Sequence, residues 1–322
     1  MTDFSRRDFV KAGATGTAAL ILGSKTPSAA APPMPERPFG RTGHNVRLFS
    51  LGGQATLEKP GTHDESIAII NRAIDLGVNY LDTARYGNGI SQTYIGEVMK
   101  TRRKEVFLAT KTRDRTRDGS LKLLEESLRT LQTDRLDLWQ LHNISEIKEL
   151  DQIFAKDGAI EALKKARDEK TVRFLGITGH FDPDVLIEGL NRFEFDTILM
   201  ALNPSDPHHL PFQTKLLPMA VQRKMGIIAM KVPARGRLFR QGGITAMKDA
   251  MTYVLSKPVC TLIVGCDNVK QVEENVQIAK EFKPLSAEKM AQLEGLTASY
   301  AMEASFFKRG GAGFGAGGGH DD

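Results

Sequence analysis

The sequence contains few residues that would cross-link the chain. Only two cysteines occur among 322 residues, Cys260 and Cys266, six positions apart in or beside one apolar run. If that run is extended, the spacing separates them by roughly 20 Å, which is too far for a disulfide. Metal ligation by this pair is not indicated either, because no second Cys or His pair stands at zinc spacing.

Long hydrophobic runs and an excess of one charge are also missing. The apolar stretch from Ala12 to Gly23 is interrupted by Gly and Thr and is far shorter than the roughly 20 residues that cross a bilayer. The formal net charge is +5, and it falls to about +3 if residues 1–31 are removed. We therefore expect no nucleic-acid partner and no stable insertion in a membrane.

The beginning of the chain has the pattern of a twin-arginine signal peptide. The segment Ser5-Arg6-Arg7-Asp8-Phe9-Val10-Lys11 precedes the weakly apolar stretch, and a run of small residues, Ser28 to Ala31, offers a cleavage site before Pro32. A basic N-terminal helix fits this ending poorly. The pattern predicts a signal peptide over residues 1–31 and export of the folded protein to the periplasm or another extracytoplasmic compartment. Folding in the reducing cytoplasm first agrees with the lack of a disulfide.

The remaining chain alternates short apolar runs with amphipathic helical patterns. Several runs are continuously apolar, as parallel strands covered by helices are. The expected strands are Arg47–Leu51, Tyr80–Ala84, Val106–Lys111, Leu136–His142, Val172–Thr178, Thr197–Leu202, Ile227–Val232 and Thr261–Gly265. Eight strand–helix units predict an α/β fold, the (β/α)8 or TIM barrel. A doubly wound open sheet is the alternative, but the Gly-x-Gly-x-x-Gly loop that it favours is absent.

The two ends of the expected barrel carry additions. The segment 38–43 predicts an N-terminal β-hairpin that closes the barrel bottom, and Ser286 to Phe307 predicts an extra C-terminal helix. We expect the barrel domain to span residues 32–307. The tail, residues 308–322, has seven glycines between Gly310 and Gly319 and is expected to be disordered.

Chemically useful side chains fall where the expected strands end. These are Asp82, Tyr86, Lys111 and His142, from three adjacent strand–helix units. In such a barrel the carboxyl ends of the strands form one rim, so we expect the four side chains to lie together. A Lys or His that closes an apolar strand is also unusual, because its burial needs a partner.

With these residues in place, the chain closely resembles the aldo-keto reductases from about residue 36 to residue 300. The matching stretches are Tyr80-Leu81-Asp82-Thr83-Ala84-Arg85-Tyr86-Gly87, Leu108-Ala109-Thr110-Lys111, Leu136-Asp137-Leu138-Trp139-Gln140-Leu141-His142, Gly176-Ile177-Thr178-Gly179-His180 and Gly265-Cys266-Asp267-Asn268-Val269-Lys270-Gln271-Val272-Glu273-Glu274-Asn275. The resemblance implies reduction of an aldehyde or ketone by hydride from NADPH or NADH, or oxidation of the alcohol by hydride transfer to NADP or NAD.

The resemblance also implies a role for each of the four residues. Tyr86 would be the general acid, and Lys111 would lower its pKa. Asp82 would compensate the buried charge of Lys111, and a neutral His142 would orient the substrate oxygen. Cofactor-binding positions implied in the same way are Gly53, Thr178, Gly179, Asn203, Lys231, Val232, Gly236, Leu238, Gly265, Asp267, Gln271, Glu274 and Asn275.

Three positions depart from the family pattern. Tyr86 follows Asp82 by four residues instead of five, which would displace its hydroxyl, and Tyr94 is the only substitute nearby. Leu199 stands where many members have a Gln that contacts the nicotinamide. Gln271 stands where an Arg often pairs with the 2′-phosphate of NADP. We still favour NADP over NAD by the habit of the family.

Two functions follow from these observations. The first is an exported oxidoreductase for a small carbonyl or alcohol substrate, with a redox partner that re-reduces its nucleotide outside the cytoplasm. The second is a nucleotide-holding or regulatory barrel with little turnover, as in potassium-channel β-subunits. A metal-dependent barrel hydrolase lacks the His-x-His motif or clustered carboxylates at strand ends that it needs. The substrate pocket is expected to involve Leu57–Thr62, Arg85, His180 and Pro204–Pro211, and Arg85 and His180 suggest an anionic or strongly polar substrate.

Overall fold

A computed structural model describes residues 33–308 of the chain. The predicted signal peptide and the glycine-rich segment after Lys308 lie outside the described residues, so the predicted domain boundaries remain predictions. None of the helices in the described part is long and apolar enough to span a membrane.

The eight parallel strands close into a barrel, in the order β10, β3, β4, β5, β6, β7, β8 and β9. Their bounds are β3 Phe49–Gly52, β4 Tyr80–Asp82, β5 Phe107–Thr112, β6 Leu136–Leu141, β7 Val172–Gly179, β8 Thr197–Ala201, β9 Gly226–Met230 and β10 Thr261–Val264. Pairing of β10 with both β3 and β9 closes the ring. The predicted (β/α)8 barrel is therefore confirmed, and the open doubly wound sheet is not formed.

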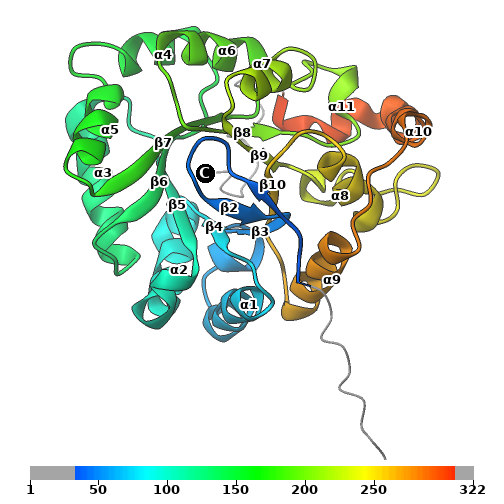
Figure 1. Ribbon diagram of the computed structural model, residues 1–322, viewed down its shortest axis with the longest axis horizontal. Coiled ribbons are helices and arrows are strands. Elements are labelled where there is room, and N and C mark those ends of the chain that lie inside the picture. The colour runs from blue at the N-terminus through cyan, green and yellow to red at the C-terminus, as the bar shows by residue number, and fades with distance from the viewer. Residues whose placement is uncertain (1–32, 309–322) are drawn as a thin grey trace, which may run out of the picture. The chain divides into compact units, whose positions relative to one another are not determined.

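Helices surround this ring of strands (Figure 1). The helices are α1 His63–Asp75, α2 Ile90–Arg102, α3 Arg117–Thr130, α4 Ile147–Ile153, α5 Ala159–Asp168, α6 Pro183–Arg192, α7 Leu216–Gln222, α8 Met247–Leu255, α9 Val269–Lys280, α10 Ala287–Thr297 and α11 Ala301–Ala304. The strands β3, β5, β6 and β8 are buried along their whole length because helices cover their outer face and side chains fill the inside. Side-chain caps start several helices; Asn268, for example, accepts a hydrogen bond from the Gln271 amide at the start of α9.

A hairpin closes the amino-terminal end of the barrel, as predicted. Its strands, β1 Glu36–Pro38 and β2 Asn45–Arg47, pair antiparallel. Phe39, in the turn, packs edge to face on Tyr80 and Phe107 at the starts of β4 and β5. Gly40 is required there because a Cβ at this position would lie 2.2 Å from the backbone nitrogen of Gly226.

The C-terminal helical pattern is broken into pieces rather than continuous. After α10, the single turn Ala298–Tyr300 leads to the short helix α11. Tyr300 leaves the helical backbone conformation, and its buried hydroxyl accepts a hydrogen bond from the Ile244 amide and donates one to the Leu238 carbonyl. This anchoring to the loop after β9 explains why one straight helix does not form.

Both cysteines are buried free thiols, as their spacing predicts. Cys260 precedes β10 and Cys266 follows it. The Cys266 sulfur accepts a hydrogen bond from the Asn275 side chain at 3.5 Å. Burial raises the pKa of the Cys266 thiol to about 12, so this residue acts as a packed side chain rather than a thiolate.

Candidate active site

The carboxyl ends of the barrel strands surround a cavity of about 580 Å³. Asp82 ends β4, Lys111 lies near the end of β5, His142 follows β6, and Tyr86 begins the turn after β4. All four line the cavity. The fold thus gathers the four side chains that the sequence placed at strand ends.

Asp82 and Lys111 form an ion pair in which each side chain is only 1% exposed. The Lys111 ammonium also donates to the Thr83 carbonyl at 2.9 Å. Burial alone lowers the pKa of Lys111, but the charges and hydrogen bonds of Asp82 and Tyr86 together raise it above its usual value. Lys111 therefore stays positively charged at neutral pH, although it is buried.

Two further side chains hold Asp82 in place. The Tyr80 hydroxyl donates to Asp82 Oδ2 at 3.1 Å, and Gln140 Nε2 donates to the same oxygen at 3.0 Å. Neither role is predicted by the sequence pattern used above, yet the sequence carries a signal for both. Tyr80 precedes Asp82 by two positions on β4 and so lies on the same face of the strand. Gln140 is a polar residue in the otherwise mostly apolar strand β6.

The Tyr86 ring lies beside Lys111, whose Nζ is 5.5 Å from the ring centroid. Burial is the largest influence on the Tyr86 hydroxyl and raises its pKa above the usual value, although the Lys111 charge acts in the opposite direction. The effect of burial therefore outweighs the expected lowering of this pKa by Lys111. The reason is that removing a phenolate from water costs more here than one nearby ammonium returns.

The turn directly after Tyr86 is made by residues in the left-handed conformation. Gly87, Asn88 and Gly89 have φ values of +58°, +57° and +97°. A Cβ on Gly87 would lie 2.1 Å from the Glu58 carbonyl oxygen, so only glycine permits this approach. With this turn, Tyr86 lines the cavity beside Lys111 although the loop is one residue shorter than expected. Tyr94 lies in α2, and its hydroxyl donates to the Lys59 carbonyl instead.

His142 is partly buried next to Tyr86, with the two rings edge to face and their centroids 5.9 Å apart. Burial lowers the pKa of His142 well below its usual value, and the charge of Lys111 lowers it further. The imidazole is therefore neutral at pH 7, as expected from the sequence. Its Nδ1 is buried and has no hydrogen-bond partner within residues 33–308.

Of the predicted cofactor-binding residues at or after the ends of β3, β7 and β8, some line the cavity and others do not. Gly53 and Thr178 line the cavity, but Gly179 and Asn203 do not. A Cβ on Gly179 would lie 2.5 Å from the Ile144 carbonyl oxygen, so this glycine permits close packing of two loops. Asn203 donates to the Lys231 carbonyl at 3.0 Å and accepts hydrogen bonds from the Ser205 amide and hydroxyl.

The predicted cofactor-binding residues in the loop after β9 likewise fall into cavity-lining and core positions. Lys231 and Gly236 line the cavity, whereas Val232 and Leu238 are fully buried in the core. Lys231, Ala234 and Arg235 all have positive φ values, between 49° and 59°, which is uncommon for residues other than glycine. Such strained backbone is often found at binding loops. Arg235 also lines the cavity, and its guanidinium lies 3.7 Å from the Glu58 carboxylate.

At the start of α9, all five predicted residues line the cavity, namely Gly265, Asp267, Gln271, Glu274 and Asn275. Gln271 Oε1 accepts a hydrogen bond from the Asp267 amide at 2.8 Å, so this side chain also shapes the turn into the helix. Lys59, from the loop after β3, lies 3.5 Å from the Asp267 carboxylate. Lys59 thereby offsets the negative charge of Asp267, which alone would repel a phosphate.

One expected pocket residue and one expected segment lie outside the cavity wall, and one residue of the wall was not predicted. Arg85 forms an ion pair with Glu126 and is absent from the cavity wall. The segment Pro204–Pro211 is absent from the wall as well. Arg113, two positions after Lys111, lines the cavity instead. The sequence signal for Arg113 was its place just beyond the carboxyl end of β5.

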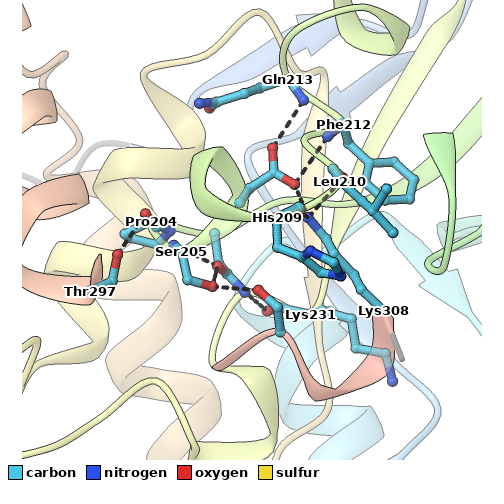
Figure 2. A network of polar contacts seen from close by, with 12 residues as sticks. Pro204, Ser205, His209, Leu210, Phe212, Gln213, Lys231, Thr297 and Lys308 are labelled. Atoms are coloured by element: carbon cyan, nitrogen blue, oxygen red, sulfur yellow. Dashed lines mark hydrogen bonds and ion pairs between the residues drawn. The ribbon is translucent and has the colours of Figure 1, made fainter. Parts of the chain in front are cut away.

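A buried polar network explains why the loop after β8 lies away from the cavity (Figure 2). Lys308 donates to the Asp206 carboxylate and to the carbonyls of His209 and Leu210. The Ser205 and Ser305 hydroxyls are hydrogen-bonded at 2.9 Å. The carbonyl of Phe307, the residue before Lys308, accepts a hydrogen bond from His180 Nδ1 at 3.1 Å. Because His180 lines the cavity, this hydrogen bond joins the network to the cavity wall.

Comparison with known proteins agrees with this geometry. The model of the aldo/keto reductase family matches residues 48–251. An uncharacterized oxidoreductase of Bacillus subtilis, YqkF, is 25% identical over 312 residues, which cover 82% of this chain and 97% of that protein. The L-galactose dehydrogenase of Arabidopsis thaliana is 29% identical over 303 residues, 81% of this chain and 93% of the relative.

Solved structures show the same relationship. The holo form of the aldo-keto reductase AKR11C1 from Bacillus halodurans superposes with a TM-score of 0.69 at 26% identity. The match covers 82% of this chain and 96% of that one. The similarity therefore extends over nearly the whole length of these proteins.

Proposed function

The chain belongs to the aldo/keto reductase family, and we propose that it reduces a small aldehyde or ketone with NADPH, or oxidises the corresponding alcohol with NADP. The observation that carries this proposal is the cluster of Asp82, Lys111, Tyr86 and His142 in the cavity wall. A charged lysine, a protonated tyrosine and a neutral histidine together suit proton transfer to a carbonyl oxygen.

The donor set of the cavity fits a dinucleotide. Lys231, Arg235 and Lys59 supply positive charge for phosphates, and the start of α9 adds backbone amides. Glu274 and Asn275 offer a carboxylate and an amide to an adenine or a ribose. When bound, the nicotinamide would supply the hydride. We favour NADP because these three basic side chains line the cavity, and because Lys59 lies beside Asp267, where a 2′-phosphate would otherwise meet a negative charge.

Tyr86 would donate its hydroxyl proton to the substrate oxygen. Its raised pKa keeps the phenol protonated at neutral pH, so the proton is available in the ground state. As the phenolate forms, the Lys111 ammonium would stabilise the negative charge, because the two groups are in contact and Asp82 holds the lysine in position. Neutral His142 would hydrogen-bond the same substrate oxygen and orient it.

The decisive experiment compares Tyr86→Phe with the wild-type protein. We expect the variant to lose carbonyl reduction by a factor of about 100 to 10,000, the usual contribution of a positioned acid. NADPH affinity, measured by fluorescence titration, should change little, because the hydroxyl acts on the substrate. Tyr94→Phe is the matched control and should retain turnover. Comparable rates for Tyr86→Phe and wild type would refute the assignment.

The second candidate is a nucleotide-holding barrel with little turnover, and the connection between Asp82 and Tyr86, one residue shorter than the family pattern, favours it. The NADPH titration and the rate measurement described above distinguish the reductase from the regulatory barrel. Tight NADP binding with no turnover of any aldehyde by the wild-type protein would support the regulatory function. Failure to bind either NADP or NAD would exclude both.

We also propose that residues 1–31 direct export of the folded protein by the twin-arginine route. The support is the Arg6-Arg7 motif and the small-residue ending of that segment. Outside the cytoplasm the nucleotide would need a redox partner for re-reduction. Replacing both arginines by lysine should leave the protein in the cytoplasm of a fractionated cell. Purification of NADP-loaded protein from the periplasm would show that the cofactor travels with it.

A further inference from the structure

The loop after β9 lines the cavity in a backbone conformation that is uncommon for its residues. Its contributions to the cavity wall are Lys231, Pro233, Arg235 and Gly236. Lys231, Ala234 and Arg235 have φ values of +59°, +49° and +52°, in the left-handed region that residues other than glycine rarely adopt. A backbone of this kind persists only where the surrounding structure holds it, so the contacts behind the loop decide what the loop presents to the cavity.

Asn203, which does not line the cavity, holds this loop through the Lys231 carbonyl. Asn203 Nδ2 donates to the carbonyl oxygen at 3.0 Å, and the Ala234 amide donates to the same oxygen at 3.0 Å. Asn203 Oδ1 accepts hydrogen bonds from the Ser205 amide at 2.8 Å and from the Ser205 hydroxyl at 2.6 Å. These two donors fix the orientation of the Asn203 amide group, because a flipped group would set its NH2 against the Ser205 amide.

The hydrogen bonds continue from Ser205 to the C-terminal segment (Figure 2). The oxygens of the Ser205 and Ser305 hydroxyls are 2.9 Å apart. Because the Ser205 hydroxyl donates its single proton to Asn203, the proton between the two serines comes from Ser305. These three side chains and the Lys231 carbonyl form one directed set of hydrogen bonds, the Ser305–Lys231 network. All three side chains belong to residues that are at most 1% exposed, so water does not readily replace a lost hydrogen bond.

Further contacts attach the same C-terminal segment to the more distant part of the loop. The Tyr300 hydroxyl donates to the Leu238 carbonyl and accepts from the Ile244 amide, each at 3.0 Å. Arg240 forms an ion pair with Glu303, and its guanidinium carbon lies 3.9 Å from the centroid of the Tyr300 ring. The C-terminal segment therefore supports the loop after β9 at both of its ends.

We propose that Asn203 is a positioning residue for the nucleotide site, and that Ser305 of the C-terminal segment keeps Asn203 in the required orientation. This inference rests on the proposed function, because the nucleotide that it concerns is the NADP of that reaction. Loss of either side chain frees the Lys231 carbonyl and lets the loop leave its left-handed conformation. The nucleotide then binds less tightly, because only the fraction of molecules with an ordered loop is competent to bind.

The affinity for NADP tests the role of the network. In a fluorescence titration, Ser305→Ala should raise the Kd of NADP by about threefold to tenfold, as expected for the loss of one buried hydrogen bond. Asn203→Ala should raise it by at least as much. Ser305→Thr keeps a hydroxyl and should bind NADP more tightly than Ser305→Ala. The matched control is Ser286→Ala, which removes a serine hydroxyl at the start of α10, outside the network, and should keep the wild-type Kd.

The double variant Asn203→Ala/Ser305→Ala distinguishes an action through Asn203 from a general loss of packing. If Ser305 acts through Asn203, the double variant should have the same Kd as Asn203→Ala alone. Losses of affinity that add up in the double variant, or a wild-type Kd in Ser305→Ala, would overturn the proposal. Ser305→Ala is the milder change, so its Kd and its hydrogen exchange carry the test if Asn203→Ala does not fold.

Amide hydrogen exchange without nucleotide gives a readout that does not depend on the reaction. The Ala234 and Gly236 amides donate to the Lys231 and Pro233 carbonyls within the loop. In Asn203→Ala and Ser305→Ala these amides should exchange about threefold faster or more, and in Ser286→Ala at the wild-type rate. If the wild-type protein binds neither NADP nor NAD but exchange still rises, the proposed reaction fails and the positioning of the loop stands. Unchanged exchange of these amides in both variants contradicts the positioning role.

Discussion

The ammonium of Lys308 and the carboxylate of Asp206 form an ion pair of 2.5 Å in which the side chains are 1% and 2% exposed. The pair joins the end of the described chain to the loop after β8. The Phe212 and Gln213 amides also donate to this carboxylate, at 3.1 and 3.0 Å. The loop and the C-terminal segment are therefore held by one buried network.

We expect Lys308→Met to destabilise the protein, because it leaves a buried carboxylate without its cation. Removal of one partner of a buried pair costs about 3–5 kcal/mol in free energy of unfolding. Urea denaturation followed by circular dichroism measures this cost. Lys270→Gln, which breaks an exposed pair with Glu274, is the control and should leave the midpoint unchanged. Equal midpoints for the two variants would show that the buried pair is not required for stability.

The hydrogen bonds to Asp82 predict graded effects on catalysis. Asp82→Asn removes the charge that compensates Lys111, so the pKa of Lys111 should fall and kcat should drop by about 100-fold or more. Tyr80→Phe and Gln140→Leu each remove one hydrogen bond but keep the carboxylate. Their kcat values should fall by less than that of Asp82→Asn. Single-turnover rates with saturating NADPH test the order, and a larger loss in Tyr80→Phe than in Asp82→Asn would contradict it.

The raised pKa of Tyr86 predicts opposite pH profiles for the two directions of the reaction. Carbonyl reduction needs the protonated phenol, which persists up to and beyond the usual pKa of about 10, so kcat/KM should be flat from about pH 6 to 9. Alcohol oxidation needs the phenolate and should rise with pH over the same range. Initial rates in both directions measure this. A reduction rate that falls steadily above pH 7 would argue against a protonated Tyr86 as the acid.

His180 predicts a loss of stability in acid. Its folded-state pKa is about 3, below the unfolded value of about 6.5, so the unfolded chain binds an additional proton between these values. Stability from this group is therefore present above pH 6.5 and is lost as pH falls, by about 2 kcal/mol at pH 5. In His180→Gln, the decrease in the free energy of unfolding between pH 7 and pH 5 should therefore be smaller than in the wild-type protein by this amount. Identical pH slopes in urea denaturation would contradict the prediction.

The sequence predicted the parts of the active site that depend on strand order alone. Asp82, Lys111 and His142 each end or follow a strand, and parallel strands in a closed barrel bring these ends together whatever the loops do. Strand order does not predict which charged side chains in the loops pair with one another. Arg85 was expected at the substrate pocket, but it pairs with Glu126, whereas Arg113 lines the cavity.

The residues of this chain by themselves determined the barrel, its hairpin and the four side chains at one rim, because strand periodicity and strand ends are local properties. Only the tertiary structure decided that Lys308 neutralises Asp206, 102 positions away, and that Asn203 supports the Lys231 loop instead of the cavity. It also decided the direction in which the pKa of Tyr86 shifts, because burial outweighs the charge of Lys111. These outcomes depend on which groups lose water and which meet across the fold, and no single stretch of sequence contains that information.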